Sequence, residues 1–101
     1  MIPNHFDVII IGAGASGLCC AAHAALRKQR VLILDHSVKL AEKIRISGGG
    51  RCNFTNLNAS PEHYVSQNKA YTTSALSRYT PYNFCELLAN HNISYHEKTA
   101  G

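Results

Sequence analysis

The sequence has no tryptophan, one methionine and three prolines in 101 residues, and only 8% of its residues are aromatic. No hydrophobic run approaches the ~18 residues that a membrane-spanning helix requires. The apolar run over residues 8–11 is short and has no basic leader before it, so no signal peptide is expected. The four cysteines form neither a CxxC pair nor a zinc-ligand spacing; they are Cys19, Cys20, Cys52 and Cys85. We therefore expect a reduced, cytoplasmic chain without a metal site.

Charged residues are also scarce, at 16%, and acidic residues are fewer than basic ones. The formal net charge is +4, and the whole excess lies in residues 1–56. A hydrophobic fraction of 46% is ordinary for a globular domain and argues against disorder. The uneven charge indicates an anionic ligand in the first half. Direct nucleic-acid binding is the less favoured alternative, because the phosphates of a cofactor would account for this charge.

Residues 6–11 form an almost unbroken, β-branched apolar run, typical of a strand buried on both faces of a parallel sheet. Residues 15–28 predict a helix with one apolar stripe. Cys19 and Cys20 of this alanine-rich helix are expected to be small core residues. Residues 31–35 predict a second buried strand. These segments make one βαβ unit, and hence an α/β, Rossmann-like fold.

Beyond the second strand the pattern predicts shorter elements. In order, these are a basic connector over residues 36–45 with room for a helical turn, a polar loop over 53–68, a short helix over 72–79, a helix from Pro81, and a short strand over 94–98. Thr80 is a favoured N-cap for the helix from Pro81, since proline suits the first helical position. No third parallel strand is evident. We therefore expect the parallel sheet formed by residues 1–101 to be incomplete.

The turn after the first strand has the pattern GxGxxG in residues 12–17. Gly12 suits the tight turn, Gly14 lets the backbone approach a pyrophosphate, and Gly17 lets helix and strand pack closely. The amino terminus of the helix offers free N–H groups to phosphate. Asp35 ends the second strand, where a carboxylate accepts hydrogen bonds from a ribose diol. No basic residue directly follows Asp35, which disfavours NADP at this site.

Two other nucleotide and catalytic motifs are excluded at this turn. A P-loop would need Lys followed by Ser or Thr where Leu18 and Cys19 stand. A nucleophile elbow would need glycine in place of Leu18. Ser16 is therefore interpreted as a phosphate-binding or helix-capping hydroxyl. A glycine turn that only packs a helix on a strand remains the alternative.

Residues 47–53, SGGGRCN, are the most unusual stretch of the chain. Three consecutive glycines are costly in backbone entropy, so this segment is expected to bring its main chain against a flat or anionic group. Arg51 can bind phosphate or the electron-rich edge of a ring, and Lys43 adds positive potential. A redox role for Cys52 like that in flavin disulfide reductases would need a second cysteine a few residues away. None is present, which favours a packing role. A plain surface loop is the alternative.

Residues 43–56, KIRISGGGRCNFTN, following GAGASG, resemble the signature of the BaiN/RdsA-type (YhiN-like) FAD-dependent oxidoreductases. The resemblance extends over about residues 6–101, which correspond to the N-terminal quarter of a typical member. It implies FAD as cofactor, NAD(P)H as a candidate electron donor, and reduction of a conjugated C=C bond. A uridine in ribosomal RNA is one substrate that the resemblance suggests.

The resemblance also implies positions for the cofactor. The pyrophosphate would lie against Gly12, Gly14, Ala15, Ser16 and Gly17. The adenosine ribose would bind Asp35 and His36, although the family more often has Glu where Asp35 stands. The flavin end would be lined by Lys43, Gly49, Gly50, Arg51, Cys52 and Asn53. The catalytic residues would lie outside these residues. Two alternatives are a catalytically inert truncated fragment and a small NAD- or nucleotide-binding module.

Overall fold

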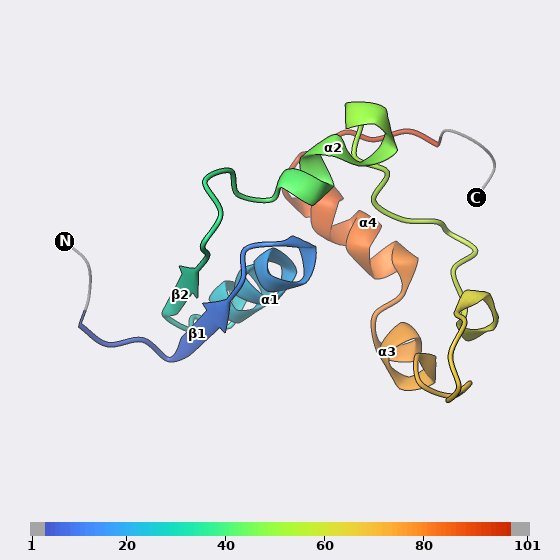
Figure 1. Ribbon diagram of the computed structural model, residues 1–101, viewed down its shortest axis with the longest axis horizontal. Helices are drawn as coiled ribbons and strands as arrows, with labels where there is room; N and C mark the ends of the chain where they lie inside the picture. The colour runs from blue at the N-terminus through green and yellow to red at the C-terminus, as the bar shows by residue number, and fades with distance from the viewer. Residues whose placement is uncertain (1–3, 98–101) are drawn as a thin grey trace. The chain divides into compact units, whose positions relative to one another are not determined.

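The computed structural model describes residues 4–97, which belong to two compact units that meet in sequence between Phe54 and Thr55. The first unit contains, in order, β1 (Val8–Ile11), α1 (Ala15–Leu26), β2 (Val31–Leu34) and α2 (Glu42–Gly50) (Figure 1). The second unit contains the short 3₁₀ helix η1 (Pro61–His63), α3 (Thr73–Arg78) and α4 (Pro81–Asn90).

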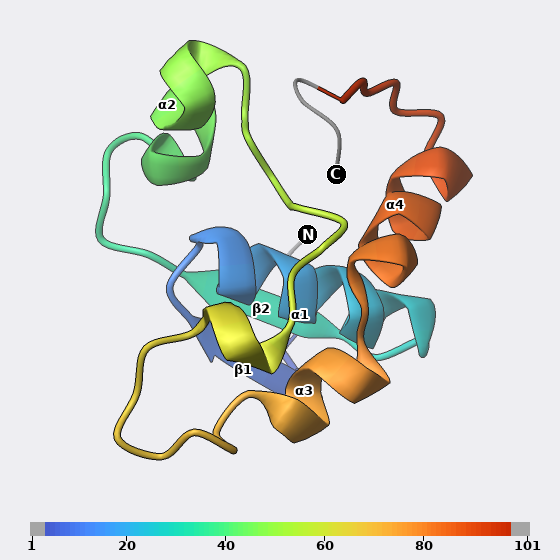
Figure 2. The ribbon, with the colours of Figure 1, turned by 90° about the vertical axis from the view of Figure 1, so that its right-hand side faces the viewer.

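The first unit is built on a βαβ arrangement, as predicted. β1 and β2 pair in parallel, with Val8 opposite Val31 and Ile11 opposite Leu34. Helix α1 packs against both strands, and Figures 1 and 2 show it lying along them. The β-branched residues of the strands suit a pleated sheet, and α1 returns the chain to the start of β2. The βαβ arrangement is therefore complete within 27 residues. The fold is α/β and Rossmann-like.

The prediction that the first strand is buried on both faces is wrong for the described residues. Val8 and Ile10 are half-buried, whereas Ile9 is 58% and Ile11 80% exposed. Successive side chains of a strand point to opposite faces, so one face lies under α1 and the other is uncovered. Ala13, at 3% exposure, is the one buried hydrophobic residue among residues 4–97.

Helix α1 is two residues shorter than predicted and its packing is one-sided. It ends at Leu26, because Arg27 is the C-cap and Lys28 adopts a left-handed backbone with φ of +61°. Cys19 is half-buried, but Cys20 is exposed, so its assignment to the core is wrong. The physical reason is that the sheet covers only one face of the helix.

The second unit confirms the two predicted helices. Thr80 caps α4: its Oγ1 accepts a hydrogen bond from the Asn83 N–H at 3.2 Å, and Asn83 Oδ1 accepts one from the Thr80 N–H at 2.7 Å. The strand predicted over residues 94–98 is wrong for residues 94–97, which are not in a strand; Lys98 lies outside the described residues. A strand needs a hydrogen-bonded neighbour, and the described elements of this unit are all helical.

Across residues 4–97, no helix combines the length and the apolar character that crossing a membrane would need.

Candidate nucleotide-binding site

The glycine turn lies at the carboxyl ends of both parallel strands, the edge at which open α/β sheets bind ligands. Gly12 has φ of +107°, a conformation that favours glycine, and its N–H donates to the Leu34 carbonyl at 2.7 Å. A Cβ on Gly17 would collide with the carbonyl oxygen of Gly12 and would lie 3.3 Å from Cγ2 of Ile10. The local fold therefore requires glycine at both of these positions.

Gly14 is different, because the described fold does not require it. No atom lies within 4 Å of a Cβ built on Gly14, and its φ of −86° and ψ of −165° suit any residue. It is the N-cap of α1, and the helical hydrogen bonds start with the Leu18 N–H, which donates to the Gly14 carbonyl at 3.0 Å. The open space beside Gly14 is what a pyrophosphate close to the main chain needs.

The first turn of α1 suits an anion. The N–H groups of Ala15, Ser16 and Gly17 precede the first intrahelical hydrogen bond and point out of the amino end of the helix. No acidic side chain lies in this turn, so no carboxylate of the turn competes with an anionic ligand for the positive end of the helix dipole. No side chain caps the helix, so the capping role suggested for Ser16 is absent and a phosphate contact remains its predicted role.

Asp35 is bound to the glycine turn. Its Oδ1 accepts a hydrogen bond from the Ala13 N–H at 3.0 Å, and its Oδ2 accepts one from the Ser37 N–H at 3.0 Å. A carboxylate oxygen can accept more than one hydrogen bond, so the exposed side chain can still bind a ribose diol. Asp35 therefore links the end of β2 to the glycine turn while remaining accessible to a ligand.

These contacts also keep Asp35 ionised. The Ala13 N–H is the largest influence that lowers the pKa of this carboxyl below 3.8, followed by the amide and hydroxyl of Ser37. The neighbouring His36 lowers it slightly further. His36 is exposed, next to Asp35, at the position expected for a second ribose contact.

The second predicted segment forms a short helix followed by a left-handed glycine turn. Ser47, with ψ of 152°, breaks the helix. Gly48, Gly49 and Gly50 follow with φ of +60°, +68° and +88°. The Cys52 N–H donates to the Ser47 carbonyl at 3.0 Å and closes the turn. Three successive positive φ angles explain why the sequence has three glycines here.

Among the cationic and polar residues predicted in this segment, Lys43 lies in the first turn of α2, whereas Arg51, Cys52 and Asn53 lie at the end of the glycine turn and after it. Lys43, Arg51 and Asn53 are exposed, as are Gly49 and Gly50. Cys52 is half-buried and has φ of +53°, an uncommon conformation for a residue with a side chain. Arg45 forms an ion pair with Glu42, with Nη2 and Oε2 2.6 Å apart, so its charge is locally matched.

Hydrogen bonds join predicted site residues and their neighbours into two sets. One set joins the glycine turn to the end of β2 through Gly12, Ala13 and Asp35. The other closes the turn between Ser47 and Cys52. Both sets belong to the first unit.

Sequence reasoning missed two residues that bind Asp35, and it missed one hollow. Ala13 and Ser37 supply the amides that bind Asp35. A small residue between two glycines, and a serine two residues after the acid, were the available signals.

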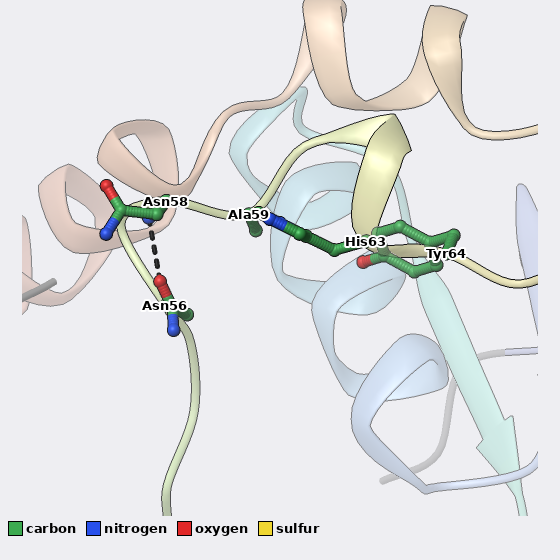
Figure 3. A pocket seen from close by; sticks show the side chains of 5 residues that line it. All are labelled: Asn56, Asn58, Ala59, His63 and Tyr64. Carbon is green, nitrogen blue, oxygen red and sulfur yellow. Dashed lines mark hydrogen bonds between the residues drawn. The ribbon is translucent and has the colours of Figure 1, made fainter.

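In the second unit a hollow of about 440 Å³ is lined by Asn56, Asn58, Ala59, His63 and Tyr64. Figure 3 shows its Asn58 N–H donating to Asn56 Oδ1, at 2.8 Å.

A parallel βαβ unit, a glycine turn that opens a helix and an acid at the end of the second strand together define a Rossmann-type nucleotide-binding domain. Comparison with known proteins agrees. The chain belongs to the family described as HI0933-like protein Rossmann domain, whose model matches residues 6–101.

Curated relatives with activities in their names align over much of the chain. It is 52% identical over 98 residues to a ribosomal RNA dihydrouridine synthase of Escherichia coli strain K12, covering 97% of the chain and 24% of that protein. It is 53% identical over 100 residues to a protein of the same name from Haemophilus influenzae, covering 99% of the chain and 25% of that protein. It is 36% identical over 73 residues to a 3-dehydro-bile acid delta(4,6)-reductase of Clostridium scindens, covering 69% of the chain and 18% of that protein. The chain thus spans about a quarter of the length of the first two relatives.

Proposed function

We propose that this chain is the FAD-binding segment of a flavin-dependent oxidoreductase that reduces a conjugated C=C bond. The open space beside Gly14, at the amino end of α1, is the observation that carries this proposal. A pyrophosphate would fit this space. Asp35 accepts a hydrogen bond from Ala13, the residue before Gly14, and is therefore close enough to bind the adjoining ribose. The names of the relatives, one a uridine-modifying synthase and one a steroid reductase, support reductive chemistry on double bonds.

The residues have distinct roles in this proposal. The amides from Gly14 to Gly17 bind the pyrophosphate, and Asp35 with His36 binds the adenosine ribose. Lys43 and the segment from Gly49 to Asn53 line the cofactor toward its flavin end. Their exposed cations and left-handed main chain suit a planar, electron-rich group.

FAD, when bound and reduced, would supply a hydride to one carbon of an electron-poor double bond, and the other carbon would take a proton from an acid or from water. We propose a uridine of ribosomal RNA as the substrate, because dihydrouridine differs from uridine by two hydrogens added across one C=C bond. NAD(P)H would supply the electrons. The residues described in this chain anchor the cofactor, and the substrate pocket would be formed by other parts of the protein.

Gly14→Val tests the cofactor assignment. Because the space beside Gly14 is open and its backbone suits valine, the variant should fold but place two methyl groups where the pyrophosphate binds. We expect the natural-length protein to lose its flavin absorbance at about 370 and 450 nm. Ala25→Val, on an exposed position of the same helix, is the matched control and should keep its flavin.

Unchanged flavin content in a folded Gly14→Val protein would contradict the pyrophosphate site. A natural-length protein that binds NAD and not FAD would instead favour the simpler nucleotide-binding module, since GxGxxG and Asp35 suit both cofactors. Circular dichroism of each variant shows whether a loss of flavin reflects the site or the fold.

A further inference from the structure

Part of the positive charge of the first unit lies away from the proposed cofactor. Arg27, Lys28 and Arg30 are exposed where α1 ends and β2 begins, and these three residues are called the amino-edge cluster below. The glycine turn follows the carboxyl end of β1 and Asp35 follows that of β2, and the arrowheads in Figure 1 mark these two ends. A four-residue strand spans roughly 13 Å. The phosphates of a cofactor at the glycine turn therefore do not account for this charge.

The backbone fixes the cluster on a short, well-bonded turn. The N–H of Arg27 donates to the Ala24 carbonyl at 3.0 Å, and that of Lys28 donates to the Ala25 carbonyl at 2.9 Å. Lys28 has φ of +61°, in the position after the C-cap where glycine is preferred. A lysine is less stable than glycine in this conformation, so the backbone at this position does not favour lysine.

The helix dipole favours a cation at this end of α1, which explains part of the cluster. It does not explain Arg30, which lies beyond the helix and directly before β2. The acid described at this edge is Asp7, whose Oδ2 accepts the Arg30 backbone N–H at 2.8 Å and whose Oδ1 lies 3.6 Å from Nε2 of His5. Three cations and one carboxylate leave a net charge of +2 at this edge, in contrast to the matched pair of Glu42 and Arg45.

We propose that the amino-edge cluster binds the phosphodiester backbone of the RNA substrate. This inference rests on the proposed function, which makes RNA the substrate. Contacts of cations with phosphates orient a nucleic acid without reading its sequence, and a rigid turn with three exposed cations suits that role. The cluster would hold RNA at the edge of the sheet opposite the glycine turn, so it can bind RNA without competing with FAD.

A charge-matched pair of double variants tests the proposal in the natural-length, flavin-loaded protein. Lys28→Gly with Arg30→Gln removes two charges from the cluster. Lys69→Gln with Arg78→Gln removes two charges from exposed positions of the second unit. Lys28→Gly is chosen because glycine suits the left-handed backbone, so this variant should fold at least as stably as the wild type. The probe is unmodified ribosomal RNA transcribed in vitro.

We expect the cluster variant to bind this RNA roughly tenfold more weakly, with a slope of log affinity against log salt that is less steep by about 1.5. The control pair should retain its affinity, and both proteins should retain their flavin. RNA affinity and salt slope equal to those of the wild type would overturn the proposal. An equal loss in both pairs would also overturn it, since net charge alone would then be responsible.

Two further measurements identify what has failed. If the wild type binds phosphatidylserine vesicles through the cluster and does not bind RNA, the RNA proposal is overturned. The flavin absorbance of the same samples reports on the cofactor separately. A protein without flavin contradicts the proposed function, whereas a flavin-loaded protein with unchanged RNA affinity contradicts only the cluster.

Discussion

Asp35 combines a structural contact with a predicted ligand contact in a single side chain. The hydrogen bond from the Ala13 N–H to its Oδ1 holds the glycine turn against the end of β2. Hydrogen bonds from backbone amides stabilise the charged carboxylate and lower its pKa. A carboxyl with a lowered pKa stabilises the fold above its ordinary pKa, and this contribution is lost as the pH falls through the lowered value. At neutral pH the contact is therefore fully present.

The two roles of Asp35 can be separated with a nucleotide that lacks ribose hydroxyls. Asp35→Ala should weaken binding of ADP, and it should also weaken binding of 2′,3′-dideoxy-ADP several-fold, because the turn that receives the diphosphate loses its anchor. Asp35→Asn retains an oxygen for the Ala13 N–H and should lose less affinity for the dideoxy nucleotide. Calorimetric titration of the natural-length, flavin-depleted protein measures both. A dideoxy-ADP affinity that is unchanged in Asp35→Ala would show that Asp35 acts only through the ribose.

At the scale of elements, the turn after α2 shows what consecutive glycines are used for. Gly48 and Gly49 have nearly the same backbone, with φ of +60° and +68°. Their surroundings differ, since a Cβ on Gly48 would lie 2.8 Å from Cβ and 2.9 Å from N of Asn53, whereas nothing lies within 4 Å of a Cβ on Gly49. Gly48 is therefore needed for packing of the turn, and Gly49 leaves open space at its surface.

This difference predicts unequal effects of the same substitution. Gly48→Ala and Gly49→Ala both place a side chain in a left-handed conformation, which costs about 1–2 kcal/mol. Gly48→Ala must also displace Asn53, so its free energy of unfolding should be lower than that of Gly49→Ala by a further ~1 kcal/mol or more. Gly49→Ala should instead lose flavin if the open space faces the cofactor. Chemical unfolding with flavin absorbance measures both effects, and equal stabilities would contradict the packing role of Gly48.

Considering the whole molecule, the sequence predicted the features that depend on neighbouring residues. The βαβ unit follows from two β-branched runs around a glycine turn, and the start of α4 follows from Thr80 and Pro81. Features that depend on distant contacts were not predicted correctly. Residues 94–97 have no partner strand in the described part of their unit, and Cys20 lies on the helix face that the sheet does not cover.

The candidate site divides in the same way. The positive φ of Gly12 and the close approach at Gly17 follow from the motif, and the structure has both. The bond between Asp35 and the Ala13 amide could not be predicted, because it depends on the register of the two strands. A separate role for the amino-edge cluster was also missed, because the positive charge of the first half was assigned to the phosphates of a cofactor.

The uncovered face of the sheet leads to a prediction about the 101-residue chain studied alone. Ile9, Ile11 and Leu34 are 58%, 80% and 48% exposed, and contiguous apolar surface of this kind drives association. An open strand edge adds unpaired backbone groups that can join another chain. We therefore expect the isolated chain to self-associate and to increase the fluorescence of a hydrophobic dye.

Ile9→Thr with Ile11→Thr should reduce both signals, because threonine retains the β-branched shape that suits a strand while removing apolar surface. Val8→Thr with Ile10→Thr is the matched control: it changes the half-buried face under α1 and should destabilise the fold without reducing association. Sedimentation velocity over a range of concentrations measures the outcome. A monomeric wild-type chain that unfolds cooperatively and does not bind the dye would show that this face does not need a covering layer.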